Sequence, residues 1–323
     1  MRRKEFIKSI LLVSAMTGMS VKQSLAALSP LKKLKKPGIQ LFSVPALLEK
    51  NFRGAITLLA EMGYKEVELF GPYDYSAQEA KDSWNSIKSF LPFGGGSGYF
   101  GLDEKQIASI MKESGITIPS IHTDLISLKT KMEHFAAASE SLGFKYVVLP
   151  SIPENERKTM DDYKRMADTF NKIGEEAQKV GLRFGYHNHG YGLQEVDGNI
   201  PLQILLDATD PELVFLEMDI FWTFAGKADP LTYLKKYSGR YKLLHLKDMK
   251  EKATFSGDGS DASQWIELFP YMTSIGEGVV DIQSIISTAT KNGAEHFFVE
   301  QDMVREPEIA LKTSIDNLKL MKF

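Results

Sequence analysis

The sequence predicts an α/β protein whose single domain, residues 37–323, is a (β/α)8 TIM barrel. From Pro37 onward, short β-branched or aromatic segments alternate with longer segments of helical periodicity, and eight such units can be counted. Eight units of about 35 residues match the size of this barrel. A doubly wound open sheet is the alternative, but residues 40–44 are followed by Pro45 and not by the glycine-rich phosphate loop that such a sheet needs.

The expected strands are short and rich in β-branched, aromatic or leucine residues. They are residues 38–44, 66–70, 117–122, 145–150, 183–187, 213–219, 241–246 and 296–301. Residues 146–149 and 242–244 show little alternation of polar and apolar side chains. Such runs are typical of parallel strands covered on both faces.

The expected helices lie between and after these strands. They are near residues 51–62, 103–114, 129–142, 157–180, 200–208, 230–237, 281–292 and 305–321. Start signals such as Asp103 introduce several of them, and a glycine such as Gly115 ends several just before the next strand. Residues 71–101 and 248–276 are expected to be long loops over the C-terminal mouth of the barrel.

Residues 1–27 are typical of an export signal, with a basic start at 2–4, an apolar run at 10–15 and small residues before a cleavage site near Ala26. The start resembles a twin-arginine leader in which lysine replaces the second arginine. Residues 28–36 are a basic linker. The apolar run is too short to span a bilayer, so we expect a periplasmic or otherwise exported protein without stable membrane insertion after signal removal. An amphipathic N-terminal helix is the alternative.

Composition limits the partners and the chemistry. The 323 residues are 43% hydrophobic and 25% charged, which is typical of a globular chain. A net charge of -3 gives no broad basic surface, so no nucleic acid partner is expected. Because the chain has no cysteine, any metal must be held by histidine, aspartate or glutamate. Assembly into a homo-oligomer is compatible with the sequence.

Ionisable residues end the last four expected strands in pairs spaced by two, so each pair shares one face of its strand. The pairs are His187 and His189, Glu217 and Asp219, His245 and Lys247, and Glu300 and Asp302. A lone histidine is more often a structural hydrogen-bonding residue, but four matching strand ends favour a shared site. His187, Asp219, His245 and Glu300 offer two nitrogens and two carboxylates, which suit one divalent ion of Mn, Co, Zn or Fe.

Other residues are candidates for substrate contact. His122 and Glu68 end or lie within earlier strands, where a structural hydrogen bond is equally plausible. Glu277 follows Gly276 at a position where barrels often bind phosphate, and its charge argues for an unphosphorylated substrate. Trp222 follows Asp219 and is expected to wall a sugar face, with packing under a lid as the alternative.

Three short motifs carry a resemblance to a known family. They are Leu-Leu-His-Leu-Lys-Asp at 243–248, Ile-Gly-Glu-Gly at 275–278 and Val-Glu at 299–300. With them, the chain after residue 37 resembles the xylose-isomerase-like TIM-barrel superfamily, the sugar phosphate isomerase/epimerase group. The resemblance implies one divalent metal, with Asp219, His245 and Glu300 as ligands. His187 stands where many relatives have a glutamate ligand.

The resemblance implies a metal-dependent sugar isomerase or epimerase that works through a metal-bound enediolate. The export signal and Glu277 add the expectation that it is exported and acts on an unphosphorylated carbohydrate. Glu300 is the expected base, and His187 and His189 are the other expected catalytic residues. The expected substrate contacts are His122, Glu68, Lys247, Glu277 and Trp222. Without the usual second glutamate, one-base isomerisation or elimination fits better than symmetric epimerisation. The alternatives are a 3-keto-glycoside lyase or hydrolase and a non-catalytic carbohydrate-binding barrel.

Overall fold

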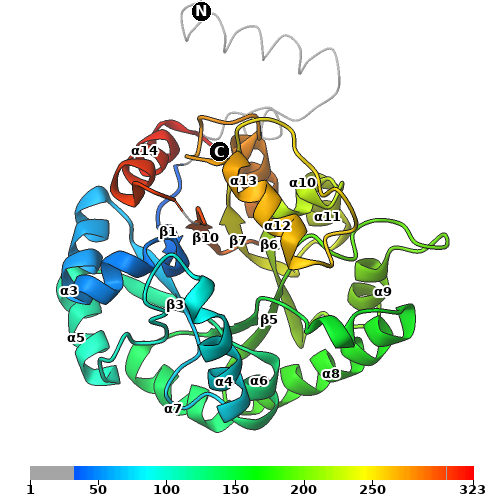
Figure 1. Cartoon of the computed structure of the whole chain (residues 1–323), viewed down its shortest axis with the longest axis horizontal. Coiled ribbons are helices and arrows are strands. Elements are labelled where there is room, and N and C mark those ends of the chain that lie inside the picture. The colour runs from blue at the N-terminus through cyan, green and yellow to red at the C-terminus, as the bar shows by residue number, and fades with distance from the viewer. Residues whose placement is uncertain (1–32, 303) are drawn as a thin grey trace, which may run out of the picture.

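The computed structural model describes residues 33–302 and 304–323, and it confirms the (β/α)8 barrel. Eight parallel strands close in the order β1-β10-β7-β6-β5-β4-β3-β2. The strands are β1 (Pro37–Gln40), β2 (Glu66–Phe70), β3 (Thr117–His122), β4 (Tyr146–Leu149), β5 (Arg183–His187), β6 (Val214–Asp219), β7 (Tyr241–Leu246) and β10 (His296–Val299). Figure 1 shows them around the centre of the molecule, inside an outer ring of helices.

The outer helices follow the strands in the expected alternation. They are α3 (Pro45–Met62), α5 (Glu104–Ser114), α7 (Met132–Leu142), α8 (Met160–Lys179), α9 (Pro201–Asp207), α11 (Pro230–Lys236), α13 (Ile282–Lys291) and α14 (Pro307–Leu320). Asp103 caps α5 with a hydrogen bond to the backbone of Gln106, and left-handed Gly115 ends it, as the sequence predicts. Both ribbon views place α14 beside β1, and Tyr64, which lies between α3 and β2, donates from its Oη to the Leu311 carbonyl of α14.

Large apolar side chains fill the N-terminal end of the barrel interior. Tyr146, Val148, Leu243 and Phe298 form one buried cluster there. Gly38 is required opposite Phe298, because a Cβ on it would lie 2.5 Å from the phenyl ring. The filled end leaves the C-terminal mouth as the place for a polar site.

Both long segments over the mouth carry secondary structure, which corrects the prediction that they are loops. Residues 71–101 contain α4 (Gln78–Ile87) and a 3-10 turn η2 (Lys88–Phe90). Residues 248–276 contain a two-stranded hairpin of β8 (Asp248–Met249) and β9 (Met272–Thr273), with α12 (Ala262–Leu268) and the 3-10 turn η4 (Phe269–Tyr271) between them. Short helices α6 (Leu125–Thr130) and α10 (Ile220–Ala225) also follow β3 and β6 directly. These helices give the mouth ordered walls.

The first strand is shorter than predicted. It ends at Gln40, and the chain continues as a 3-10 turn η1 (Leu41–Ser43), because the side chain of Gln40 accepts a hydrogen bond from the Phe42 amide and turns the backbone. The predicted export signal lies outside the described residues, as does most of the predicted linker. Among the described helices, none combines the length and apolar character needed to cross a membrane.

Candidate active site

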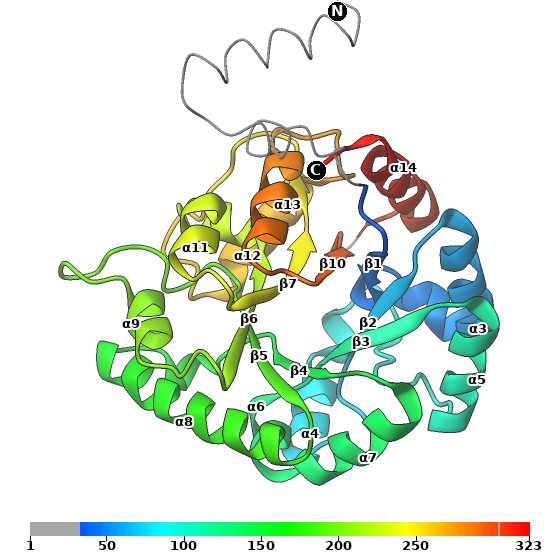
Figure 2. The ribbon, with the colours of Figure 1, turned by 180° about the vertical axis from the view of Figure 1, so that it is seen from behind.

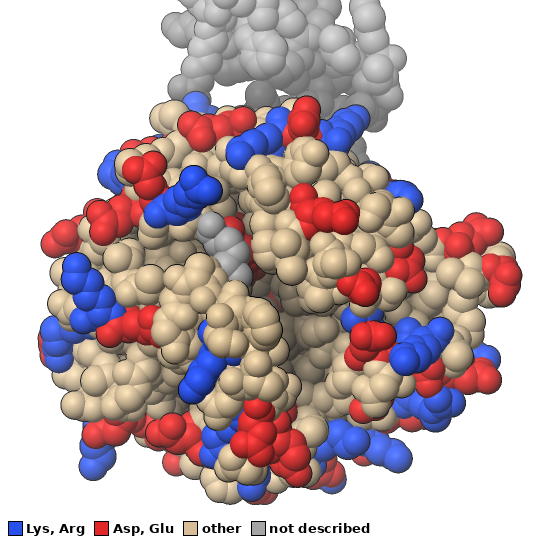
Figure 3. Space-filling model, in the orientation of Figure 1, with Lys and Arg blue, Asp and Glu red and all other residues tan. Residues whose placement is uncertain are grey.

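A deep pocket opens at the C-terminal mouth of the barrel. It has a volume of about 630 Å³, and strand ends and the helices of the mouth loops line it. Figure 3 shows a hollow near the centre of this face, with mostly uncharged residues around it. Its polar lining includes His122, His187, His189, His245, Lys247, Glu300 and Asp302. The expected strand-end residues therefore meet in one place.

Two buried glutamates form the floor below these histidines. Glu217 Oε2 on β6 accepts hydrogen bonds from His122 Nε2 at 2.6 Å and from His187 Nδ1 at 3.0 Å. Glu68 Oε2 on β2 accepts from His245 Nε2 at 2.6 Å and from the side-chain amide of Gln40 at 2.8 Å. Each histidine that borders the floor thus has one ring nitrogen committed to a glutamate.

A second layer lies above this floor, closer to the mouth. His245 Nδ1 donates to Glu300 Oε2 at 2.6 Å, and His187 Nε2 lies 3.6 Å from Asp219 Oδ2. Lys247 Nζ is 3.0 Å from Asp219 Oδ2, 2.8 Å from Glu300 Oε2 and 2.8 Å from Asp302 Oδ2. All of these side chains are buried. Asp219, His245 and Glu300 could together hold a metal, and so could His122, His187, Glu217 and His245.

The donor set fits a divalent cation on charge. Within this cluster, five buried carboxylates outnumber the ammonium of Lys247 and the imidazoles of His122 and His245, whose pKa values are raised; the carboxylates are those of Glu68, Glu217, Asp219, Glu300 and Asp302. Glu68 Oε1 and Glu217 Oε1 have no hydrogen-bond partner among the described residues. Buried, incompletely paired carboxylates are costly unless a cation neutralises them. Imidazole and carboxylate donors suit Zn²⁺, Mn²⁺, Co²⁺ or Fe²⁺.

Proton affinities in the cluster are strongly shifted. Burial lowers the pKa of His187 well below its usual value. Burial opposes charge on His122 as well, but the carboxylates of Glu68 and Glu217 outweigh it and raise the pKa to about 9. Burial also raises the pKa of Asp302 to about 7. The two neighbouring histidines His187 and His122 thus differ strongly in pKa.

His189 differs from the other histidines because a carbonyl, not a carboxylate, holds it. Its Nδ1 donates to the Pro150 carbonyl, and its ring stacks on Trp265 with 5.4 Å between ring centroids. Burial and the charge of Lys247 lower its pKa to about 3. Because Nδ1 carries the proton, Nε2 presents a free lone pair in the pocket. His189 is therefore neutral, and its Nε2 is the ring nitrogen open to a substrate.

The backbone around Asp219 holds the β6 end of the site in place. Asp219 is the N-cap of α10 and accepts from the Trp222 amide at 2.9 Å. Gly190, at a φ of 83°, passes so close to this helix that a Cβ would lie 2.4 Å from the Trp222 carbonyl. The helix thereby brings the indole of Trp222 to the pocket wall.

Two of the motifs form one structural unit. Asp248 Oδ2 accepts from the amides of Gly276 at 2.8 Å and Gly278 at 3.1 Å, and its Oδ1 accepts from the Val280 amide at 3.2 Å. This arrangement also sets the position of Glu277, a predicted substrate contact. Asp248 draws the backbone of the turn towards the barrel, and the exposed Glu277 lies outside the pocket lining.

The structure also places the remaining candidates. His122, Lys247 and Trp222 line the pocket, whereas Glu68 and Asp219 lie just behind its surface. Glu217 was not predicted as a site residue, although its spacing from Asp219 puts it on the inward face. Gln40 and Phe42 at the end of β1 were also not predicted, because nothing in that strand is ionisable.

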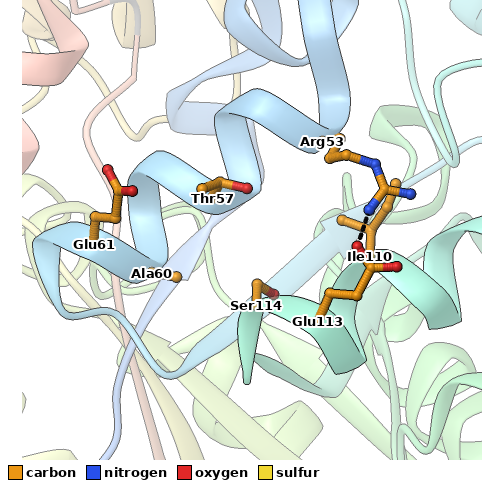
Figure 4. Close-up of a pocket in the computed structure, with 7 residues that line it drawn as sticks. All are labelled: Arg53, Thr57, Ala60, Glu61, Ile110, Glu113 and Ser114. Carbon is orange, nitrogen blue, oxygen red and sulfur yellow. Dashed lines mark hydrogen bonds and ion pairs between the residues drawn. The ribbon is translucent and has the colours of Figure 1, made fainter.

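A second depression lies between α3 and α5, far from the mouth, with a volume of about 390 Å³. Figure 4 shows Arg53 of α3 paired with Glu113 of α5 at one side of it. Its lining includes no histidine, and both charged partners are largely exposed. It brings together no group suited to catalysis.

Comparisons with known proteins agree with this geometry. The model of the xylose isomerase-like TIM barrel family matches residues 56–321. The chain is 30% identical over 273 residues to the inosose dehydratase of Clostridium tetani, covering 80% of this chain and 85% of that protein. It is 33% identical over 162 residues to inosose dehydratase 2 of Bacillus cereus, covering 48% of this chain and about half (53%) of that relative.

Solved structures show the same fold. A sugar phosphate isomerase/epimerase from Parabacteroides distasonis superimposes with a TM-score of 0.67 at 23% identity, covering 89% of this chain and 94% of that chain. The IOLI protein, solved with a bound zinc atom, superimposes with a TM-score of 0.63 at 15% identity, covering 89% and 99%. At these identities the likeness concerns the fold alone.

Proposed function

The chain belongs to the xylose isomerase-like TIM barrel family, and on that premise we propose that it is a metal-assisted lyase acting on a keto sugar or keto cyclitol. The enzyme removes a proton beside the ketone and expels an oxygen leaving group from the next carbon. The relatives named inosose dehydratase support elimination over the isomerisation expected first from the sequence. The observation that carries the proposal is the free Nε2 of His189 beside Lys247 in the pocket.

We assign the metal to His187, Asp219, His245 and Glu300. The floor glutamates support this choice, because Glu217 holds His187 Nδ1 and Glu68 holds His245 Nε2. His187 Nε2 then faces Asp219 and His245 Nδ1 faces Glu300, so a metal in the upper layer, where substrate can reach it, would take the place of the proton that His245 Nδ1 shares with Glu300. The deeper set with Glu217 and His122 is the alternative. When bound, the metal supplies Lewis acidity that polarises the ketone oxygen.

Proton transfer falls to His189. Its Nε2 takes the proton from the carbon beside the ketone, the electron pair forms a carbon–carbon double bond, and the next carbon–oxygen bond breaks. The same imidazolium returns the proton to the departing oxygen. Buried Lys247, in contact with Asp219, Glu300 and Asp302, keeps a positive charge beside the site of proton transfer in a water-poor position. His122, which also lines the pocket, is available to contact a substrate hydroxyl.

The arrangement around Glu300 weighs against symmetric epimerisation. Glu300 was the expected base, but its Oε2 accepts from both His245 and Lys247. These contacts occupy the Glu300 carboxylate and hold its pKa well below its usual value despite its burial, whereas His189 Nε2 has no hydrogen-bond partner among the described residues. With His189 Nε2 as the proton acceptor, a single-base reaction is the better match.

Product analysis tests the proposal. The protein is incubated with inosose and with 3-keto-glucose, with and without added Mn²⁺, Co²⁺ or Zn²⁺, and products are identified by mass spectrometry. We expect loss of one water from at least one substrate, dependent on metal. Products of unchanged mass would favour the isomerase, and binding without turnover or solvent deuterium exchange would favour a non-catalytic carbohydrate-binding barrel.

Export remains part of the proposal. The basic start and apolar run within residues 1–27 support secretion to the periplasm. N-terminal sequencing of protein recovered from the periplasm of a bacterial host tests it. We expect a mature chain that begins close to residue 27, and recovery of the full-length chain in the cytoplasm alone would contradict export.

A further inference from the structure

The pocket is divided into a charged floor and an apolar rim. Its volume of about 630 Å³ lies within the roughly 300–1,000 Å³ of pockets that enclose drug-sized ligands. The catalytic groups occupy the floor at the strand ends. The rim is built from aromatic and aliphatic side chains of the mouth loops, and it extends the pocket beyond the groups needed for elimination.

One wall of the rim comes from the segments after β1 and β2. Phe42 meets Phe70 edge-to-face at 5.1 Å, and Phe70 meets Trp84 of α4 at 6.1 Å. Trp84 Nε1 donates to the Gly95 carbonyl at 2.7 Å, so its polar group is satisfied within the protein. Ile87 follows one turn later on α4 and is 46% exposed. This wall, called here the α4 wall, offers a mainly apolar surface, although Glu79 and Ser83 of the same helix also line the pocket.

The other wall, called here the α12 wall, comes from the segments after β6 and β7. Trp222 lies 6.3 Å from Trp265 and 6.1 Å from Phe269 between ring centroids. Trp265 Nε1 donates to the Gly259 carbonyl at 2.8 Å. Because β2 and β6 are four strands apart in the closed ring, the two walls stand on opposite sides of the mouth.

Charge narrows the class of ligand. Among the described residues that line the pocket, Lys247 is the single lysine or arginine, and both it and the histidines His122 and His245 are paired with buried carboxylates on the floor. Glu79 and Asp124 add negative charge at the rim. An anionic group at the rim would be repelled, whereas an uncharged apolar ring would bury itself between aromatic faces.

We propose that the substrate is a 3-keto glycoside whose uncharged, ring-bearing aglycone lies between the α4 wall and the α12 wall. This inference rests on the proposed lyase function and names its leaving group. The aglycone of a glycoside is attached to carbon 1, so its elimination requires proton loss from the neighbouring carbon 2. Carbon 2 is acidic when the ketone is next to it, at carbon 3.

The reaction balances without a further reactant. His189 takes the proton from carbon 2, its electron pair forms the double bond between carbons 1 and 2, and the bond from carbon 1 to the glycosidic oxygen breaks. The aglycone leaves as an alcohol after taking the proton from His189. The sugar product is an unsaturated ketone, so neither an oxidant nor water is consumed in this step.

The test compares two substrates whose leaving groups are of similar basicity, ethyl and 2-phenylethyl 3-keto-glucoside. We expect the phenylethyl compound to have at least about a tenfold higher kcat/KM, as burial of the added ring predicts. Ile87→Ala should bring this ratio down about threefold. Ile309→Ala is the matched control, because Ile309 is 62% exposed on α14, away from the pocket, and it should leave the ratio unchanged.

The outcomes separate this inference from the proposed function. Equal rates for both glycosides, or a ratio that Ile87→Ala and Ile309→Ala alter alike, would overturn the subsite while the lyase stands. Dehydration of inosose without turnover of either glycoside would do the same. If no substrate is eliminated, equilibrium binding of the two unoxidised glucosides is measured instead. Tighter binding of the phenylethyl compound that is lost in Ile87→Ala supports the subsite, although the lyase proposal then fails. Equal binding of the two compounds overturns both proposals.

Discussion

Replacing Glu217 by glutamine tests how the floor prepares the metal ligands. Glu217→Gln keeps the shape of the side chain but removes the charge that holds His187 Nδ1 and His122 Nε2 at 3.0 and 2.6 Å. A neutral amide no longer fixes which ring nitrogen of His187 faces Asp219. Loss of such an orienting partner weakens metal binding by about 10- to 100-fold, which is about 1.4 to 2.7 kcal/mol.

The assay is calorimetric titration of metal-free protein with Zn²⁺ and with Co²⁺ in the presence of a competing chelator. Glu113→Gln is the matched control, because Glu113 is exposed on α5 and contacts Arg53 and Ser109 at the second depression, outside the pocket of the mouth. An unchanged dissociation constant in Glu217→Gln would refute the orienting role. Complete loss of binding would instead make Glu217 a ligand and move the metal to the deeper set.

The remaining predictions concern the upper layer, the base and the filled end of the barrel. His245→Ala should lose its stoichiometric metal but keep its far-ultraviolet circular dichroism, and retained metal by elemental analysis would count against the ligand assignment. His189→Gln should lower kcat for elimination by about 10²- to 10⁴-fold with little change in KM, and a loss confined to KM would reassign it to binding. Gly38→Ala should destabilise the fold by about 1 to 3 kcal/mol in urea denaturation, because its Cβ would lie 2.5 Å from Phe298, and an unchanged midpoint would mean that this ring moves freely.

The barrel itself could be predicted from sequence because its signals are local. A few neighbouring residues determine where a helix begins, as at Asp103, and where it ends, as at Gly115. The helices of the mouth loops were missed because α4 is mostly polar and lies between glycine- and proline-rich stretches. Its fold depends on contacts such as Trp84 with Phe70, which join distant segments.

The sequence predicts which strand ends carry the site residues, but it does not predict the hydrogen bonds between their side chains. Spacing by two residues indicates that Glu217 and Asp219 point the same way, yet it does not say that Glu217 takes the nitrogens of two histidines. The free nitrogen of His189 depends on the Pro150 carbonyl, which comes from another strand end. The position of Glu277 outside the pocket lining could not be predicted, because the sequence does not show that Asp248 binds the backbone of its turn.

Asp248 has an engineering consequence. Its carboxylate fastens the base of the 248–280 segment by three amide hydrogen bonds, while the aromatic surface presented to the mouth comes from the helix in the middle of that segment. The base of the segment is thus held in place independently of the helix that faces the mouth. Exchanging residues between Met249 and Met272 for those of a relative, with Asp248 and both glycines retained, should graft a new specificity onto an undisturbed catalytic floor.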